Sequence, residues 1–193
     1  MLRSLYNRIM SLAASRYATW TLAAVSFAES SFFPIPPDVL LIPMVLARRA
    51  SAWLYAAICT AASILGGLFG WLIGAFLFTS IALPILEFYG YADQFDSFAQ
   101  RYNDQGAWIV FFAGLTPFPY KVITIASGAT GLSLPVFLAA SVLSRGLRFF
   151  AVAGLLWWLG PPIRDFIERW LGLLFTIFVI LLIGGFVGVR YLL

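Results

Sequence analysis

The chain of 193 residues has no histidine and a single cysteine, Cys59. Without histidine it lacks the base of a serine or cysteine nucleophile pair and the zinc ligands of an HExxH helix. A lone cysteine allows no disulfide within the chain, and the apolar run around Cys59 favours a small buried side chain. We therefore expect a protein that is not an enzyme and that binds neither a metal ion nor a cofactor.

Charged residues are scarce as well. They make up 10% of the chain, whereas a soluble domain carries about 25%. Hydrophobic residues make up 62%, and a chain of this length cannot bury so much apolar surface in one core. These proportions predict an integral membrane protein. The net charge of +4 is scattered and indicates no nucleic-acid partner, so the basic residues are better explained by membrane topology and contacts with lipid headgroups.

The N-terminal segment 1–16 carries its arginines among apolar residues at helical spacing. This pattern predicts an amphipathic helix that lies in the membrane interface. The segment and the apolar run after it also resemble a signal peptide with cleavage after Ala28. That alternative is disfavoured because the chain stays apolar beyond Glu29.

Apolar runs divide the rest of the chain into predicted elements. The runs 51–79 and 134–159 have the length of a transmembrane helix. Two further runs, 17–47 and 106–130, are apolar but interrupted by prolines. The remaining segments are an acidic, aromatic loop that includes a short surface helix, 80–105, and a C-terminal region of an amphipathic turn and a last span, 161–193.

The two interrupted runs share a motif. FPIPPDV (33–39) aligns with TPFPYKV (116–122), which places Asp38 over Lys121. Proline removes a backbone donor and restricts the residue before it, so neither run can be one continuous helix. Within hydrocarbon such a break is tolerated where protein or a polar cavity surrounds it. Each run therefore predicts a re-entrant hairpin of two half-helices, with the breaks at Pro34, Pro36, Pro37, Pro117 and Pro119.

The charge distribution supports these hairpins. They keep the N-terminus, Arg48 and Arg49 on one side of the membrane and place the acidic segment 80–105 on the other. This arrangement follows the positive-inside rule and predicts a multi-pass protein with a cytoplasmic N-terminus. The hairpins then enter from opposite faces. The predicted fold is an all-α inverted repeat of two re-entrant hairpins, each followed by a transmembrane helix, with an N-terminal amphipathic helix and a C-terminal transmembrane helix.

Three glycines, Gly66, Gly70 and Gly74, are spaced four residues apart along the run 51–79. Small residues at this spacing allow another backbone to approach the helix closely. We interpret them as a packing face within the chain, and a homo-oligomer remains open.

Five charged residues fall within the apolar runs: Glu29, Asp38, Lys121, Arg145 and Arg148. A charge at the bilayer centre costs about 2.5–3.5 kcal/mol even on a lenient insertion scale, so such residues must face inward, pair or meet water. If the hairpin tips meet at the midplane, Asp38 would pair with Lys121. That pair is either a structural bridge between the hairpins or part of a transport pathway.

The same five residues suggest a chemistry. Arg145 and Arg148 are three residues apart and share a helix face, and together with Lys121 they could bind a phosphate. Glu29 and Asp38 could take up and release protons. The pattern predicts a carrier for an anionic headgroup, with proton coupling as an option. The alternatives are a proton-coupled antiporter of small solutes or ions, and a membrane-assembly factor that transports nothing.

These motifs occur in a familiar order. Glu29 with the FPIPPD segment, the glycine-rich helix, the segment GLTPFPYK (114–121) and the arginine-bearing helix resemble the DedA family, also called SNARE-associated or VTT-domain proteins. The resemblance covers most of a membrane domain that we place at 17–160.

The resemblance implies two facing re-entrant hairpins, with Glu29 and Asp38 as the acidic residues of the first. It also implies a role in the bacterial cytoplasmic membrane in moving lipids, either undecaprenyl phosphate or phospholipids. The chain departs from the family pattern where Gly114 stands in place of an arginine found in many members, and where Lys121 is the base that follows. These departures indicate a divergent branch and leave the identity of the headgroup open.

Overall fold

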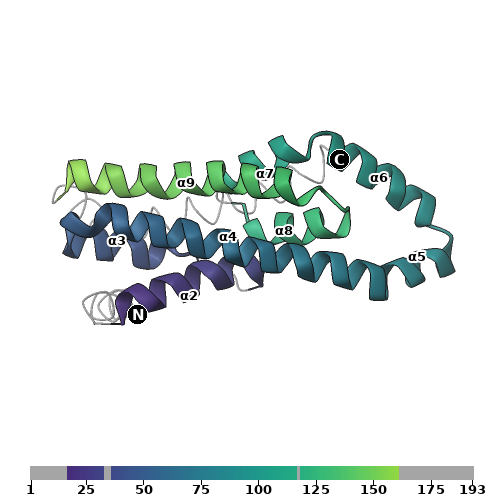
Figure 1. Cartoon of the computed structure of the whole chain (residues 1–193), viewed down its shortest axis with the longest axis horizontal. Helices are drawn as coiled ribbons and strands as arrows, with labels where there is room; N and C mark the ends of the chain where they lie inside the picture. Colours follow the sequence, from purple (N-terminus) through teal and green to yellow (C-terminus); the bar gives the residue numbers. More distant parts are fainter. Residues whose placement is uncertain (1–16, 33–35, 117, 161–193) are drawn as a thin grey trace, which may run out of the picture.

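The computed structural model describes residues 17–32, 36–116 and 118–160 (Figure 1). These residues are almost entirely helical, and none of them forms a strand. The all-helical prediction is therefore confirmed for this part of the chain. Four earlier predictions lie outside the described residues: the N-terminal amphipathic helix, the C-terminal turn and span, and the proline breaks at Pro34 and Pro117.

Two long helices form the centre of the fold. Helix α4, Ala52–Leu77, follows a short 3-10 turn, η1 (Arg49–Ser51), and continues through a π-helical stretch, η2 (Phe78–Ala82), into α5 (Leu83–Tyr89). The other long helix, α9, spans Leu134–Leu159. The stretches 49–89 and 134–159 are both long and apolar enough to cross a membrane.

The two long helices run antiparallel (Figure 1). Trp53, near the start of α4, packs on Trp157 near the end of α9, with the ring centroids 6.1 Å apart. Toward the other end, the indole Nε1 of Trp71 donates a hydrogen bond to the carbonyl oxygen of Leu132, just before α9, at 3.1 Å.

The first interrupted run forms two helices, α2 (Ala18–Ser31) and α3 (Asp38–Ala47). Helix α2 runs in the direction of α4, because Ser26 and Ser31 bond in turn to the carbonyl oxygens of Cys59 and Gly66. Helix α3 begins beside the middle of α9, and the chain just after it reaches the end of α9. Helix α3 therefore runs in the direction of α9, and α2 runs in the direction of α4. Because α4 and α9 are antiparallel, the chain folds back between α2 and α3.

The second interrupted run has the same form. Helix α7 (Gly106–Leu115) runs in the direction of α9, because its first residue lies against Leu132 and Gly114 lies against Ser144. Helix α8 (Tyr120–Ala129) runs in the direction of α4, because Thr124 lies beside Gly70 and Gly128 lies beside Trp71 and Ala75. The chain therefore also folds back between α7 and α8, toward the middle of the long helices (Figure 1).

The predicted break prolines that lie within the described residues stand just before helices, so they help to start a helix as well as to separate two helices. Pro36 and Pro37 precede α3, and the carbonyl oxygen of Pro37 accepts the N–H of Leu41 at 2.8 Å. Pro119 precedes α8, and its carbonyl oxygen accepts the N–H of Val122 at 3.0 Å. Proline suits this position because its fixed φ matches the first turn and its missing N–H would have no partner in the helix.

The segment 80–105 is largely helical, where we had expected a loop with one short helix. Helix α5 ends at Gly90, whose φ of 71° suits a residue without a side chain. Helix α6, Ala92–Asp104, follows it. The ring of Phe95 on α6 stacks on Phe78 with centroids 4.3 Å apart. This contact anchors α6 to the end of the long helix.

The glycine face of α4 lies where α2 and α8 cross it. A Cβ atom on any of its three glycines would meet atoms of those helices. The atoms concerned are the Phe27 carbonyl oxygen for Gly66, the Thr124 side chain and the Ser30 carbonyl oxygen for Gly70, and the Ile125 carbonyl oxygen for Gly74. We call α2 with α3 the first fold-back segment and α7 with α8 the second. The absence of a side chain on these glycines therefore lets both fold-back segments approach the same helix.

Candidate functional site

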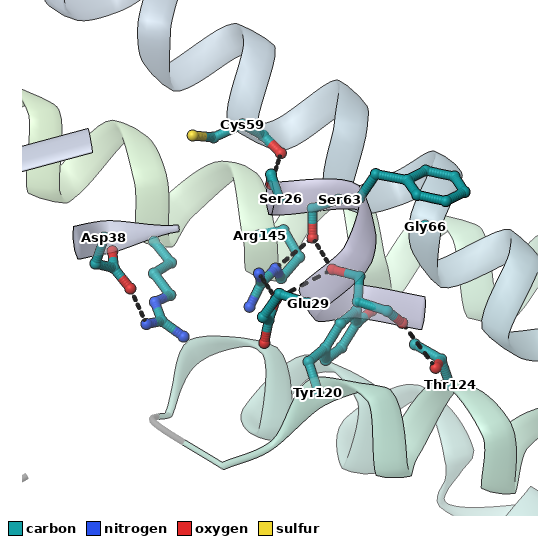
Figure 2. Close-up of polar contacts among 12 residues, drawn as sticks. Ser26, Glu29, Asp38, Cys59, Ser63, Gly66, Tyr120, Thr124 and Arg145 are labelled. Atoms are coloured by element: carbon teal, nitrogen blue, oxygen red, sulfur yellow. Dashed lines mark hydrogen bonds and ion pairs between the residues drawn. The ribbon is translucent and has the colours of Figure 1, made fainter. Parts of the chain in front are cut away.

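Two ion pairs connect the first fold-back segment to α9 (Figure 2). Glu29, in the last turn of α2, accepts a hydrogen bond from Arg145 Nη2 at 2.6 Å. Asp38, the first residue of α3, accepts one from Arg148 Nη2 at 2.5 Å. A helix start also favours a negative charge, because its first N–H groups are unpaired. The four residues predicted from the sequence thus lie together as two pairs.

The expected pair of Asp38 and Lys121 is wrong. Asp38 is held by Arg148 because α3 lies along α9. Lys121 is the second residue of α8 and is half-buried. It forms no ion pair within 4 Å with any residue in the described ranges. Among the described residues no three acidic or thiol side chains gather as a metal-binding group would require.

Arg145 is enclosed on every side. Its side chain is 1% exposed, and its Nε donates to Ser63 Oγ at 2.7 Å. The rings of Tyr120 and Phe149 lie 4.8 Å and 4.7 Å from the guanidinium carbon. Such cation–π contacts add to the ion pair with Glu29. Its Nη1 is also buried and has no hydrogen-bond partner within the described part of the chain.

Arg148 is more accessible and has a different set of partners. Its side chain is 17% exposed and that of Asp38 is 19% exposed. Besides holding Asp38, Arg148 donates from Nη1 to the carbonyl oxygen of Thr116 at 3.2 Å. Thr116 lies in the turn between α7 and α8. Arg148 therefore links the second fold-back segment to the start of α3 in the first.

Buried hydroxyl groups surround the inner pair. Ser63 lies 2.6 Å from Ser30, and Ser30 donates to Glu29 Oε2 at 3.2 Å. Thr124 of α8 donates to the carbonyl oxygen of Ser30 at 3.0 Å. Tyr120 donates to Ser141 at 2.5 Å. These hydroxyl-bearing residues were not among those predicted from the sequence, although Ser30, which follows Glu29 within an apolar run, was a signal.

Comparisons with known proteins agree with the motifs. Residues 35–157 match the model of the VTT domain. An uncharacterized protein of Haemophilus influenzae is 38% identical over 157 residues, which are 81% of this chain and 81% of that protein. An uncharacterized protein of Histophilus somni is 36% identical over 157 residues, which are 81% of this chain and 82% of that protein. No solved structure matches the chain significantly. The chain therefore belongs to the VTT-domain family of membrane proteins, the DedA family that its sequence motifs resemble.

Proposed function

We propose that the chain moves an anionic lipid headgroup, that of undecaprenyl phosphate or a phospholipid, across the bacterial cytoplasmic membrane. The observation that carries this proposal is the position of Arg148. It is partly exposed, it bridges the two fold-back segments, and its partner Asp38 has one carboxylate oxygen without a hydrogen bond in the described part of the chain. A phosphate presents the same kind of paired oxygens to a guanidinium as a carboxylate does.

We infer that the two fold-back segments are re-entrant hairpins and that the halves of the domain form an inverted repeat. The chain directions support this: α2 and α4 run together, as do α7 and α9, while α4 and α9 are antiparallel. Both long helices have 26 residues. Near the middle of each long helix, Ser63 and Arg145 bond to each other, so the two helices meet there.

Labelling of introduced cysteines tests the topology. Ser51→Cys should react from the cytoplasm and Asp96→Cys only from the outside, because the long helix between them crosses the membrane in this arrangement. The measurement is labelling of intact cells and inverted vesicles with an impermeant maleimide in a Cys59→Ala background. Cys59 is fully buried, so the unmodified chain serves as the unlabelled control. Reaction of both cysteines from one side would exclude the inverted repeat.

The two arginines have different tasks in the proposed mechanism. Arg145 is held by a carboxylate, a hydroxyl and two rings, so it is a fixed charge. Arg148 can exchange its partners. When Asp38 takes up a proton it loses the negative charge that holds Arg148, and the guanidinium can bind a phosphate instead. When Asp38 releases the proton, the ion pair forms again and the phosphate is displaced.

This mechanism depends on the two-pronged shape of the Arg148 side chain. We expect Arg148→Lys to lower the transport rate by roughly tenfold or more, because a compact ammonium cannot reach Asp38 and Thr116 together as the guanidinium does. Asp38→Asn should abolish the response of transport to a pH gradient. A matched control is Arg101→Lys, which changes an exposed arginine on α6, away from the site.

The measurement is transbilayer movement of labelled undecaprenyl phosphate and labelled phospholipid in liposomes that contain the purified protein. Protein-free liposomes give the background rate. Movement of inorganic phosphate but of neither lipid would favour a small-ion antiporter. Movement of none of the three would favour an assembly role. Wild-type rates and a wild-type pH response in Arg148→Lys and Asp38→Asn would contradict the mechanism even if lipids move.

A further inference from the structure

We propose that Ser30 and Ser63 form a hydrogen-bond relay that couples the charge of Glu29 to the contact between the two fold-back segments. Four bonds close a ring across α9, α4 and α2. They join Arg145 Nε to Ser63 at 2.7 Å, Ser63 to Ser30 at 2.6 Å, Ser30 to Glu29 Oε2 at 3.2 Å, and Glu29 Oε2 to Arg145 Nη2 at 2.6 Å (Figure 2). The two serines are positioning residues, and their effect on transport rests on the proposed function.

The direction of every bond in this ring follows from chemistry. A guanidinium can only donate, and an ionised carboxylate can only accept. Ser63 accepts the N–H of Arg145, so its own hydrogen is directed to Ser30. The hydrogen of Ser30 is then directed to Glu29 Oε2. The ring therefore has one consistent arrangement of hydrogens while Glu29 carries its negative charge.

A proton on Glu29 weakens this arrangement. On Oε2 the proton makes that atom a donor, which opposes both Ser30 and Arg145. On Oε1 it leaves the directions unchanged but removes the charge that strengthens the two bonds to Oε2. Ser30 cannot reverse the chain of donors, because Arg145 offers no acceptor at its far end. The ring is thus strongest when Glu29 is ionised.

The ring reaches the second fold-back segment through the backbone of Ser30. Its carbonyl oxygen accepts a hydrogen bond from Thr124 of α8, at the point where Gly70 lets both helices approach α4. A change in the position of Ser30 therefore acts on α8. This contact gives the charge of Glu29 a route to the junction of the two segments.

Other charged and titratable groups face the same region. Arg145 and Tyr120 both interact electrostatically with Glu29. Three further groups, each on a different helix, interact electrostatically with Arg145. The hydroxyl of Tyr120 donates its hydrogen bond to Ser141, so it is not part of the ring of four hydrogen bonds. The further groups are Asp38 on α3, Cys59 on α4 and Arg148 on α9.

The test removes one hydroxyl at a time. Ser30→Ala and Ser63→Ala each break the ring without adding volume. Ser26→Ala is the matched control: Ser26 is equally buried, lies one turn before Ser30 and bonds Cys59 across the same interface of α2 and α4, but it stands outside the ring. Ser26→Ala loses one buried hydrogen bond and each ring variant loses two, so all three should lose some stability, and the pH dependence is what separates the relay from a purely structural effect.

The first readout is the ratio of lipid transport at acid pH to that at neutral pH, with fluorescent phosphatidylglycerol as the probe. We expect both ring variants to reduce this ratio by roughly tenfold or more, the order of magnitude for one hydrogen bond to a charged group. Ser26→Ala should keep the wild-type ratio. In a Glu29→Gln background, Ser30→Ala should cause no further change in the ratio. Equal ratios in Ser30→Ala and Ser26→Ala would overturn the relay.

The second readout needs no transport. Spin labels at two exposed positions, Trp20 on α2 and Val122 on α8, report the distance between the two segments in the Cys59→Ala protein. We expect acidification to shift this distance in the wild type and in Ser26→Ala, but not in Ser30→Ala or Ser63→Ala. This result without lipid movement would uphold the relay and refute the proposed function. The relay would be refuted if the distance between the labels does not change with pH in the wild type. It would also be refuted if the distance changes by the same amount in all variants.

Discussion

Glu29→Met is expected to destabilise the protein by about 3–5 kcal/mol, because it leaves the buried guanidinium of Arg145 without its counter-charge. This loss is a large fraction of the roughly 5–15 kcal/mol that stabilises a typical folded protein. Arg145→Met should cost less. The carboxyl group left behind can bind a proton and become neutral, whereas a guanidinium keeps its charge in any protein environment.

The double variant Glu29→Met with Arg145→Met separates folding from function. Two apolar side chains of similar length remove both charges together, and such replacements of buried pairs are often neutral. We expect the double variant to recover most of the thermal stability lost in Glu29→Met and to remain inactive in lipid transport. The measurement is the unfolding temperature of the purified protein in detergent. A double variant no more stable than Glu29→Met would show that the pair is not the source of the loss.

The helices were predictable because hydrocarbon leaves the backbone few choices. The predicted spans 51–79 and 134–159 lie close to the observed α4 and α9. The breaks fall where proline removes a donor: α2 ends at Ser31, before the first proline cluster, and α8 begins at Tyr120, directly after Pro119. These features depend on local sequence alone.

The partners in the site were not predictable in the same way. Asp38 was matched with Lys121 because the two residues align in the repeat. Under the proposed inverted repeat, however, aligned residues touch only near the twofold axis, and Asp38 is paired with Arg148 instead. Which charges pair depends on α3 lying along α9, a relation between elements distant in the sequence. The serines went unnoticed because hydroxyl groups are also common in ordinary helix contacts.

The other large effect is expected where α4 crosses α8. A Cβ atom on Gly74 would overlap the carbonyl oxygen of Ile125, and one on Gly128 would overlap that of Trp71. These obstacles are backbone atoms, which cannot rotate away as a side chain can. Gly74→Ala and Gly128→Ala should therefore each force the helices apart and destabilise the protein by about 1–3 kcal/mol, the usual cost of overpacking, or more.

Gly146→Ala provides the matched control for both variants. Gly146 lies on α9 next to Arg145, and among the described residues an added Cβ would find only Thr60 Cγ2, at 3.9 Å. Alanine is also a better helix former than glycine by about 0.8–1.0 kcal/mol. We expect Gly146→Ala to match or exceed the wild-type unfolding temperature, while the two crossing variants fall below it. Because the same crossing holds Thr124 against Ser30, the crossing variants should also lose the pH response of transport. Wild-type stability in Gly74→Ala or Gly128→Ala would mean that the two helices are not in backbone contact there.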